Sequence, residues 1–404
     1  MISKIAWKNI WRAPMRSFVV IITVFFGVWA FIFSTSFILA IIQGYVDSAI
    51  RFQTSHLQIH HEEFIKDEEG KYMLNPDIKK ELDNINTINV FADRTIIKGM
   101  IQSSRAVSGI VICGGNLKKE LKLNSFNKAI IDGNYFQEGK KNEILISHKI
   151  AEKLKIKVRK KIVLQFRDKN GDLIAGSFRV AGIFKTENAV TDMTKVYVQK
   201  KDINRLYGKP DAIHEIAVKL NDVQEIAAVQ KNIRVNLKQK DVIVRNYRQI
   251  APNIQLYESQ IYISLGILLV IFMLALVFGI LNTMMMTVLE RTKELGVLMA
   301  IGMNRNKIFN MITLETILLG LIGAPMGLLF GWQTINYYHK NGIDLSQFGK
   351  GTEWFGVKSI IYPDLELKVC LLIMIGVFIT TILAAIYPSI KATKLRPVVA
   401  IRKI

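Results

Sequence analysis

The short stretch of residues 56–63 brings together side chains that metal ions prefer: His56, His60, His61, Glu62 and Glu63. Zinc sites need three or four imidazole, thiolate or carboxylate ligands that converge on one point. His56 and His60 share one face of a predicted strand, but His60 and His61 point to opposite faces because side chains alternate along a strand. The pattern therefore does not predict a metal site.

Enzyme signatures do not stand out either. No nucleophile stands beside a base, no carboxylate pair recurs at a useful spacing, and the phosphate-binding pattern GxxxxGK[ST] is absent from the sequence. The two cysteines, Cys113 and Cys370, imply no disulfide framework. We expect a chain that is not catalytic, does not hydrolyse ATP itself and binds no cofactor of its own.

One acidic residue, Glu315, interrupts an otherwise uncharged apolar run from Ile308 to Trp332. A charge at membrane depth is costly and often functional. Glu315 could couple proton movement, or it could lie near the interface and pair with Arg291 or Lys307. Both interpretations are open on these residues alone.

The stretch from Val288 to Gly302, VLERTKELGVLMAIG, lies between two segments that are each long enough to cross a bilayer. Its start is polar, and Leu295, Leu298, Met299 and Ile301 then recur at amphipathic helical spacing. Gly302 predicts the helix stop. A helix this short is not stable alone in water, so its apolar stripe needs the membrane surface or a groove on a partner. We favour a partner groove.

The segment ERTKELGVLMAIGMNRNKIFNMITLETILLGLIGAPMG resembles the loop and third helix of the MacB/LolC/LolE/FtsX family of ABC-transporter permeases. YPSIKATKLRPVVAIRK at the C-terminus and AWKNIWRAPMRS near the N-terminus are similar to that family's ends. The resemblance implies that the loop is a coupling helix that docks on an ATPase. The residues that would carry coupling are Glu290, Arg291, Glu294, Leu295, Gly296, Leu298, Ile301 and Gly302.

The resemblance also bears on Glu315 and on partners. The family has a glutamate at this place, which favours structural pairing over proton coupling. A separate ABC ATPase subunit would bind ATP and magnesium, and a second permease copy or a paralogue would complete a dimer. Membrane lipids, a lipoprotein or other cargo, and a periplasmic carrier or adaptor are the further partners that the resemblance implies.

Composition agrees with a membrane protein. Half of the 404 residues are hydrophobic, and the mean hydropathy is +0.25. The formal charge of +21 could suggest nucleic acid, but the lysines are dispersed and no basic stripe is interleaved with stacking aromatics. We therefore expect no nucleic-acid partner.

Four apolar segments predict four transmembrane helices. Residues 1–16 predict an interfacial amphipathic helix, with Lys4, Lys8, Arg12 and Arg16 at steps of four and a break at Pro14. An uncleaved first helix is preferred over a signal peptide, whose apolar core would be shorter. The predicted spans are 17–43, 259–289, 308–332 and 367–388, the last ended by Pro388.

Residues 44–258 predict a large α+β domain inserted between the first two spans, with enough length for a proper core. Ser55–Ile59 alternates as a strand, Asn75-Pro76 predicts a helix start, and Thr87–Ile112 predicts two or three strands. Residues 213–244 repeat this order, with a helix opened by Asp222.

Between these two halves, a strand-rich insert is expected at about 114–209. Lys161–Phe166 and Ser177–Phe184 predict a hairpin joined through an Asn-Gly turn. In LolC-type subunits a hairpin here carries a longer hook with a proline that recruits a lipoprotein carrier. The turn in this chain is short and lacks proline, which argues against direct carrier recruitment by residues 167–177.

The third span contains a stripe of small residues. Gly320, Gly323, Gly327 and Gly331 lie close to one line along the predicted helix. Small residues allow close approach of helices in membranes, so the stripe predicts a helix contact.

Lysine and arginine gather in residues 1–16, in the loop 290–307 and in the tail 389–404, whereas the loop 333–366 balances its lysines with acids. The positive-inside rule then places both termini in the cytoplasm and the large domain on the other side of the membrane. The resemblance implies that this membrane is a bacterial inner membrane and that the large domain is periplasmic.

The expected function is that of a permease subunit that transmits movement from an ATPase to the outer domain. Four spans, no fused ATPase and a domain of about 215 residues best resemble lipoprotein-releasing subunits. Two alternatives are FtsX-like signalling to a cell-wall hydrolase, and MacB-like export of peptides or toxins with an adaptor and an outer-membrane channel. The larger two-part domain argues against the first.

Overall fold

The computed structural model describes residues 2–12, 14–67, 69–124, 126–137, 139–345 and 360–396. It divides into two compact units. The helical unit comprises residues 1–41, 258–344 and 360–404, and the outer unit comprises residues 42–257 and 345–359. Much of the predicted loop 333–366 and the motif residues 397–403 fall outside the described residues.

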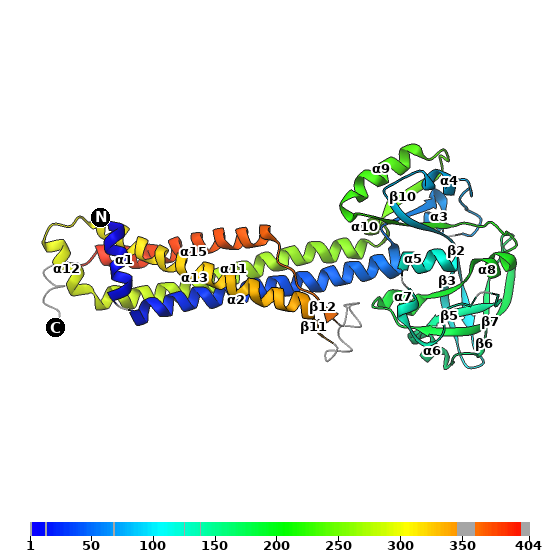
Figure 1. Ribbon diagram of the computed structural model, residues 1–404, viewed down its shortest axis with the longest axis horizontal. Helices are drawn as coiled ribbons and strands as arrows, with labels where there is room; N and C mark the ends of the chain where they lie inside the picture. Colours follow the sequence, from blue (N-terminus) through cyan, green and yellow to red (C-terminus); the bar gives the residue numbers. More distant parts are fainter. Residues whose placement is uncertain are drawn as a thin grey trace. The chain divides into compact units, whose positions relative to one another are not determined.

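Six helices build most of the helical unit (Figure 1). They are α1 (Ile2–Arg12), α2 (Pro14–Ala49), α11 (Pro252–Glu290), α12 (Thr292–Ala300), α13 (Arg305–Asn341) and α15 (Leu367–Thr393). A two-stranded ribbon pairs β11 (Ile343–Asp344) with β12 (Ile360–Ile361). Helices α2, α11, α13 and α15 are long and apolar enough to cross a membrane. Together with the α+β outer unit, they confirm the predicted class, a membrane protein with a large extramembrane domain.

Proline acts differently at two places in this unit. Pro14 begins α2, as a residue that lacks an N–H group can at the first helical position. The helix does not end at Pro388, the predicted end of the fourth span, because α15 continues to Thr393. Neighbouring helices can support a proline inside a membrane helix, and the Ser389 hydroxyl lies 3.1 Å from the Thr313 hydroxyl of α13.

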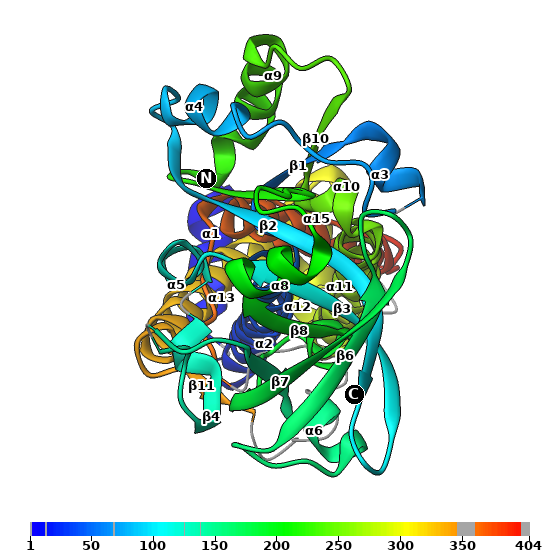
Figure 2. The same cartoon turned by 90° about the vertical axis from the view of Figure 1, so that its right-hand side faces the viewer.

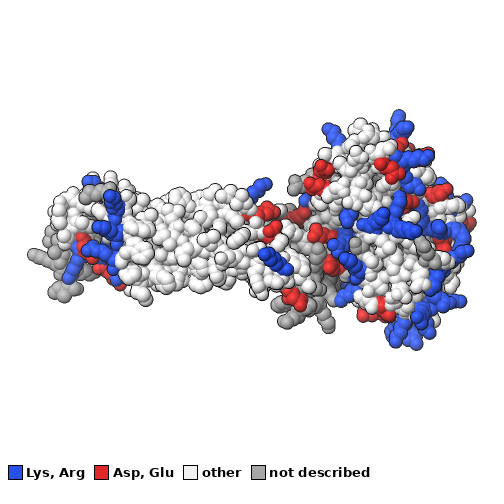
Figure 3. Space-filling view, viewed as in Figure 1, with Lys and Arg blue, Asp and Glu red and all other residues white. Residues whose placement is uncertain are grey.

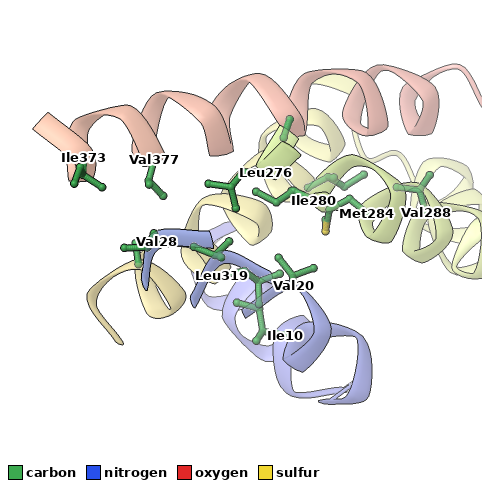
Figure 4. Close-up of a cluster of buried hydrophobic side chains, with 14 of the residues drawn as sticks. Ile10, Val20, Val28, Leu276, Ile280, Met284, Val288, Leu319, Ile373 and Val377 are labelled. Carbon is green, nitrogen blue, oxygen red and sulfur yellow. The ribbon is translucent and has the colours of Figure 1, made fainter. Parts of the chain in front are cut away.

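The core of the helical unit runs between the long helices (Figure 4). Ile10 of α1 and Val20 of α2 lie with Leu319 of α13, and Ile280 and Met284 of α11 belong to the same buried cluster. On the face shown in Figure 3, the middle of the bundle carries no lysine, arginine, aspartate or glutamate. An uncharged outer band of this kind suits a hydrocarbon environment.

The outer unit contains a ten-stranded mixed sheet (Figure 2). Its order is β10-β1-β9-β2-β3-β8-β5-β7-β4, and β6 pairs with β2 and β7. The strands are β1 (Leu57–His61), β2 (Ile88–Gln102), β3 (Val107–Gly115), β4 (Ile130–Gly133), β5 (Glu143–Ser147), β6 (Lys161–Arg167), β7 (Leu173–Phe184), β8 (Lys195–Gln199), β9 (Glu215–Leu220) and β10 (Val242–Asn246).

Short helices cover this sheet. They are α3 (Glu62–Asp67), α4 (Ile78–Asp83), α5 (Leu117–Asn124), α6 (His148–Leu154), α7 (Ala189–Thr194), α8 (Lys200–Tyr207), α9 (Ile226–Asn236) and α10 (Tyr247–Ile250). The 3-10 turns η2 (Phe126–Ala129) and η3 (Val223–Glu225) and the π-turn η1 (Ile50–Thr54) complete the unit. Two main apolar cores form, one around Ile59 and Val218 and the other around Leu164 and Val180.

Of the local predictions for the outer unit, a hairpin is confirmed and two helix starts are wrong. The hairpin of β6 and β7 is confirmed, and its turn is held by Asp168, whose Oδ1 accepts hydrogen bonds from the backbone of Asn170 and Asp172. The helix start at Asp222 is wrong, because α9 begins at Ile226 after the 3-10 turn η3. The start at Asn75-Pro76 is also early, since α4 begins at Ile78 and Asn75 instead closes a turn by accepting from the Asp77 backbone N–H.

Candidate coupling site between α11 and α13

The helix α12 is separated from α11 by a single residue, Arg291, which leaves helical geometry at φ −91° and ψ 17°. The Thr292 hydroxyl donates a hydrogen bond of 2.6 Å to the Leu289 carbonyl and so folds the start of α12 against the end of α11. This break turns the chain where the sequence becomes polar.

The end of α12 is a glycine stop, as the sequence predicted. Gly302 has φ +100°, which glycine adopts without steric cost. Its N–H donates to the Met299 carbonyl at 3.1 Å, and the Met303 N–H donates to the Leu298 carbonyl at 3.0 Å. These two bonds form a Schellman motif. Asn304 then caps α13 by accepting from the Asn306 backbone N–H.

The structure divides the apolar stripe expected for a partner groove. Leu295 is only 2% exposed and belongs to the core of the chain's own bundle, and Gly296 is buried as well. Leu298 and Met299 are half-buried against the same core. These residues are therefore taken up by intrachain packing. Ile301 remains 80% exposed.

The exposed face of α12 carries both apolar and charged side chains. Val297 and Ile301 lie one helical turn apart and are both exposed, at 43% and 80%. Lys293 and Glu294 are exposed on the preceding turn. The sequence pattern did not single out Val297, because periodicity defines a stripe but not the surface that it packs against.

Charged residues tie this turn to two other helices. Arg291 Nε donates to Glu294 Oε2 at 3.1 Å, and Arg291 Nη1 lies 3.3 Å from Glu315 Oε2. Glu315, only 4% exposed, therefore pairs with Arg291 and not with Lys307. Glu290 forms an ion pair with Arg16 of α2, a partner that sequence reasoning missed. By sequence, Arg16 stands out only as part of the basic spacing of residues 1–16.

The glycine stripe of α13 lies at close helix contacts. A Cβ at Gly323 would stand 2.9 Å from the Ile21 carbonyl oxygen, and one at Gly327 would stand 2.6 Å from the Phe25 carbonyl oxygen, both in α2. Gly331 faces Ile32 of α2 at 3.2 Å. Gly320 faces Thr381 of α15 instead. The glycine stripe therefore allows close packing of α13 against two helices, α2 and α15.

The histidines near the start of the outer unit have structural partners. His56 accepts a hydrogen bond of 3.0 Å from the Leu220 N–H, and His60 contacts the His214 carbonyl and Gln58. Among the residues that the structure describes, no three histidine, cysteine, aspartate or glutamate side chains are grouped to hold a metal ion.

Comparison with known proteins gives two family matches. Residues 17–235 match the MacB-like periplasmic core domain, and residues 266–397 match the FtsX-like permease C-terminal family. Two solved structures are similar at low scores. The extracellular domain of the transporter YknZ from Gram-positive bacteria is 15% identical, with a TM-score of 0.35 over 48% of this chain and 100% of that chain. The periplasmic region of MacB from Actinobacillus actinomycetemcomitans is 14% identical, with a TM-score of 0.38 over 52% and 97%.

Curated relatives agree with the family matches. An uncharacterized ABC transporter permease of Methanocaldococcus jannaschii is 28% identical over 50% of this chain and 50% of its own length. The uncharacterized permease YvrN of Bacillus subtilis is 26% identical over 56% and 54%. The macrolide export protein MacB of Escherichia coli is 30% identical over 39% and 25%. The chain thus spans about half the length of the two uncharacterized permeases and 25% of the length of MacB. Because the MacB-like match alone covers more than half of the chain, this protein belongs to the MacB/FtsX family of ABC-transporter permeases.

Proposed function

We propose that this chain is the transmembrane subunit of an ATP-driven transporter that transmits movement to its outer unit. The observation that carries this proposal is the construction of α12. Leu295 and the Arg291–Glu315 pair anchor the helix on the chain's own bundle, while Val297 and Ile301 stay exposed. An anchored helix with an exposed apolar edge suits docking of an ATPase subunit, which would bind ATP and magnesium.

A force that acts on α12 can be transmitted directly along the chain through helix α11. Helix α11 is continuous from Glu290 back to Pro252, about 58 Å at 1.5 Å per residue. Arg291 joins α12 to α13 through Glu315, and Glu290 joins the same turn to α2 through Arg16. Displacement of α12 by ATPase closure would therefore move three long helices together. In this proposal a second permease subunit, identical or paralogous, completes the dimer.

The proposed orientation puts α12 and both termini in the cytoplasm of a bacterial inner membrane and the outer unit in the periplasm. Positive charge supports it, because basic residues gather in residues 1–16, in the loop 290–307 and in the tail after Ser389.

The leading cargo is a lipoprotein that is extracted from the membrane. A chain with four apolar helices and a large outer unit supports this assignment by its likeness to lipoprotein-releasing subunits. The second candidate is MacB-like export of a peptide, toxin or other small cargo with an adaptor. Relatives that are named as macrolide export proteins favour this second candidate.

Depletion of the chain in its own bacterium separates these cargo classes. Inner- and outer-membrane fractions are compared for lipoproteins, and culture medium and cells are compared for exported peptides. Lipoproteins that accumulate in the inner membrane would support extraction. Normal lipoprotein distribution with retained small cargo would support export, and a cell-separation defect with neither change would point to signalling to a cell-wall hydrolase.

A further inference from the structure

The first strand of the outer unit buries both of its faces. Leu57 and Ile59 lie in an apolar core, as their alternation requires. Gln58 and His60 point to the opposite face, yet they are only 4% and 7% exposed. Polar side chains on an alternating strand normally face solvent. Here they line a cavity that is partly open to solvent.

This cavity has a volume of about 380 Å³, within the range of small-molecule sites. Its floor is one face of six neighbouring strands, from β10 through β1, β9, β2 and β3 to β8. Register places the lining side chains in rows, since Arg245 is opposite Gln58, and Lys98 is opposite Val111, which is opposite Lys195. Gln53 of η1, Phe64 and Ile65 of α3, and Ile250 of α10 complete the lining.

More cationic than anionic side chains line the cavity. Its cations are Lys98, Lys195 and Arg245, and its carboxylate is Glu215. Glu215 is already engaged, because Arg94 Nη1 donates to its Oε1 at 2.7 Å. Burial lowers the pKa of His60 below its ordinary value, so at neutral pH this ring contributes hydrogen-bonding groups and no charge.

The remaining wall is apolar. Phe64, Ile65, Val111 and Ile250 line the cavity together with Ile96. A site of this composition fits a molecule with one acidic group and a short hydrocarbon part, because charge-assisted hydrogen bonds would hold the acid and the apolar wall would cover the rest.

The cavity also touches both connections to the membrane helices. Gln53 lies in η1, directly after α2, and Ile250 is two residues before Pro252, where α11 begins. Lys195 Nζ donates to the Gln53 carbonyl at 3.1 Å, and Asn188 Nδ2 donates to Gln53 Oε1 at 3.2 Å. A bound molecule would contact the segments through which both helices join the outer unit.

We propose that this cavity is a binding site for a small anionic amphiphile, whose carboxylate or phosphate is held by cationic side chains of the lining that include Arg245. Binding joins η1 and α10 across the sheet and so restricts the two helix connections together. The site is separate from α12 and does not depend on which cargo the transporter moves.

The test uses the purified full chain in lipid nanodiscs, with empty nanodiscs as the blank. Hexyl phosphate, hexanoate and hexanol are titrated by calorimetry, and amide hydrogen exchange is measured in parallel. Hexyl phosphate and hexanoate are expected to bind and to slow amide hydrogen exchange in residues 50–54 and 247–251. The tighter of the two shows whether the site prefers a phosphate or a carboxylate. Hexanol is expected to bind at least tenfold more weakly, because it lacks the charge.

Two variants and a control locate the site. Arg245→Gln removes a cation and Val111→Phe fills the cavity, and each is expected to weaken acid binding by about tenfold or more. Lys219→Gln removes a half-buried cation that lines a different cavity and should leave binding unchanged. Wild-type affinity in Arg245→Gln, equal binding of hexanol, or an equal loss in Lys219→Gln would overturn the proposal. If Val111→Phe misfolds by hydrogen exchange, Arg245→Gln alone decides.

Discussion

Arg291 and Glu315 lie on different helices, and Arg291 Nη1 is 3.3 Å from Glu315 Oε2 inside a bundle where Glu315 is almost fully buried. A buried carboxylate in an apolar span is costly without a partner. Arg291 also bonds Glu294, so one guanidinium sets both the start of α12 and its attachment to α13. This makes the pair the most direct target for testing the turn between α11 and α12.

Arg291→Ala should destabilise the bundle by about 3 kcal/mol, because it leaves Glu315 buried and unpaired. The double variant Arg291→Ala/Glu315→Ala should lose less than the sum of the two single variants, with a coupling of about 1–3 kcal/mol. Denaturant unfolding in detergent, followed by tryptophan fluorescence, measures both effects, since Trp7, Trp11, Trp29 and Trp332 belong to the helical unit. Strictly additive losses would show that the pair is not coupled.

The divided face of α12 predicts two different defects. Ile301→Asp should weaken co-purification of the ATPase by about tenfold or more without destabilising the chain, because Ile301 is exposed. Leu295→Ala should instead lower stability by about 2–5 kcal/mol, because its side chain is buried.

Asn306→Asp is the matched control for Ile301→Asp, since it adds the same charge at an exposed position five residues away, in the first turn of α13. ATPase co-purification and stimulated ATP hydrolysis in membranes are the measurements. An Ile301→Asp chain that keeps its ATPase and full hydrolysis would reduce α12 to a membrane-surface helix.

Gly327→Ala should lower the melting temperature of the bundle, because the added methyl group would meet the Phe25 backbone oxygen, which cannot move aside. The expected cost is about 1–3 kcal/mol. Gly331→Ala meets the Ile32 side chain at 3.2 Å and no backbone atom, and Gly266→Ala meets open space, so both should cost less than Gly327→Ala. Equal melting temperatures for all three variants would contradict the assigned α2–α13 contact.

His214 predicts a pH dependence of the outer unit. Its Nε2–H donates to the Gly70 carbonyl, and its Nδ1 accepts from the Ile96 N–H, a bond that needs the neutral ring. Burial lowers the pKa of His214 to about 4. The unfolded chain therefore binds more protons, and the stabilisation present above about pH 6.5 is lost as pH falls toward 4, by about 3 kcal/mol.

Comparison with His214→Gln isolates this effect. The pKa of Asp192 is raised to about 6 by burial, and its opposite contribution cancels because it is present in both proteins. Hydrogen exchange of β2 and β9 in the full chain, measured between pH 7 and 4, gives the difference. Parallel pH curves for wild type and variant would refute the assignment to His214.

Cysteine labelling tests the proposed orientation. In a background with Cys113→Ser and Cys370→Ser, a membrane-impermeant maleimide added to spheroplasts should label Lys169→Cys but not Asn304→Cys. Permeabilised cells should label both, which controls for reactivity. The reverse pattern in intact spheroplasts would end the proposed topology.

Local sequence determined the elements whose signal lies within a few neighbouring residues. Long uncharged runs specify the four apolar helices because each helix satisfies its own backbone hydrogen bonds in lipid. The Asn-Gly turn specifies the β6–β7 hairpin, and Gly302 specifies the end of α12. In each case the deciding interaction is local or depends only on the solvent.

Tertiary structure decided which surfaces those elements share. The period of α12 predicts an apolar stripe, but only packing shows that Leu295 turns inward and Ile301 outward. The pairing of Arg16 with Glu290, the division of the glycine stripe between α2 and α15, and the burial of Gln58 and His60 join residues far apart in the chain. A periodic pattern states which residues lie on one face, but it carries no information about the distant segment that covers that face.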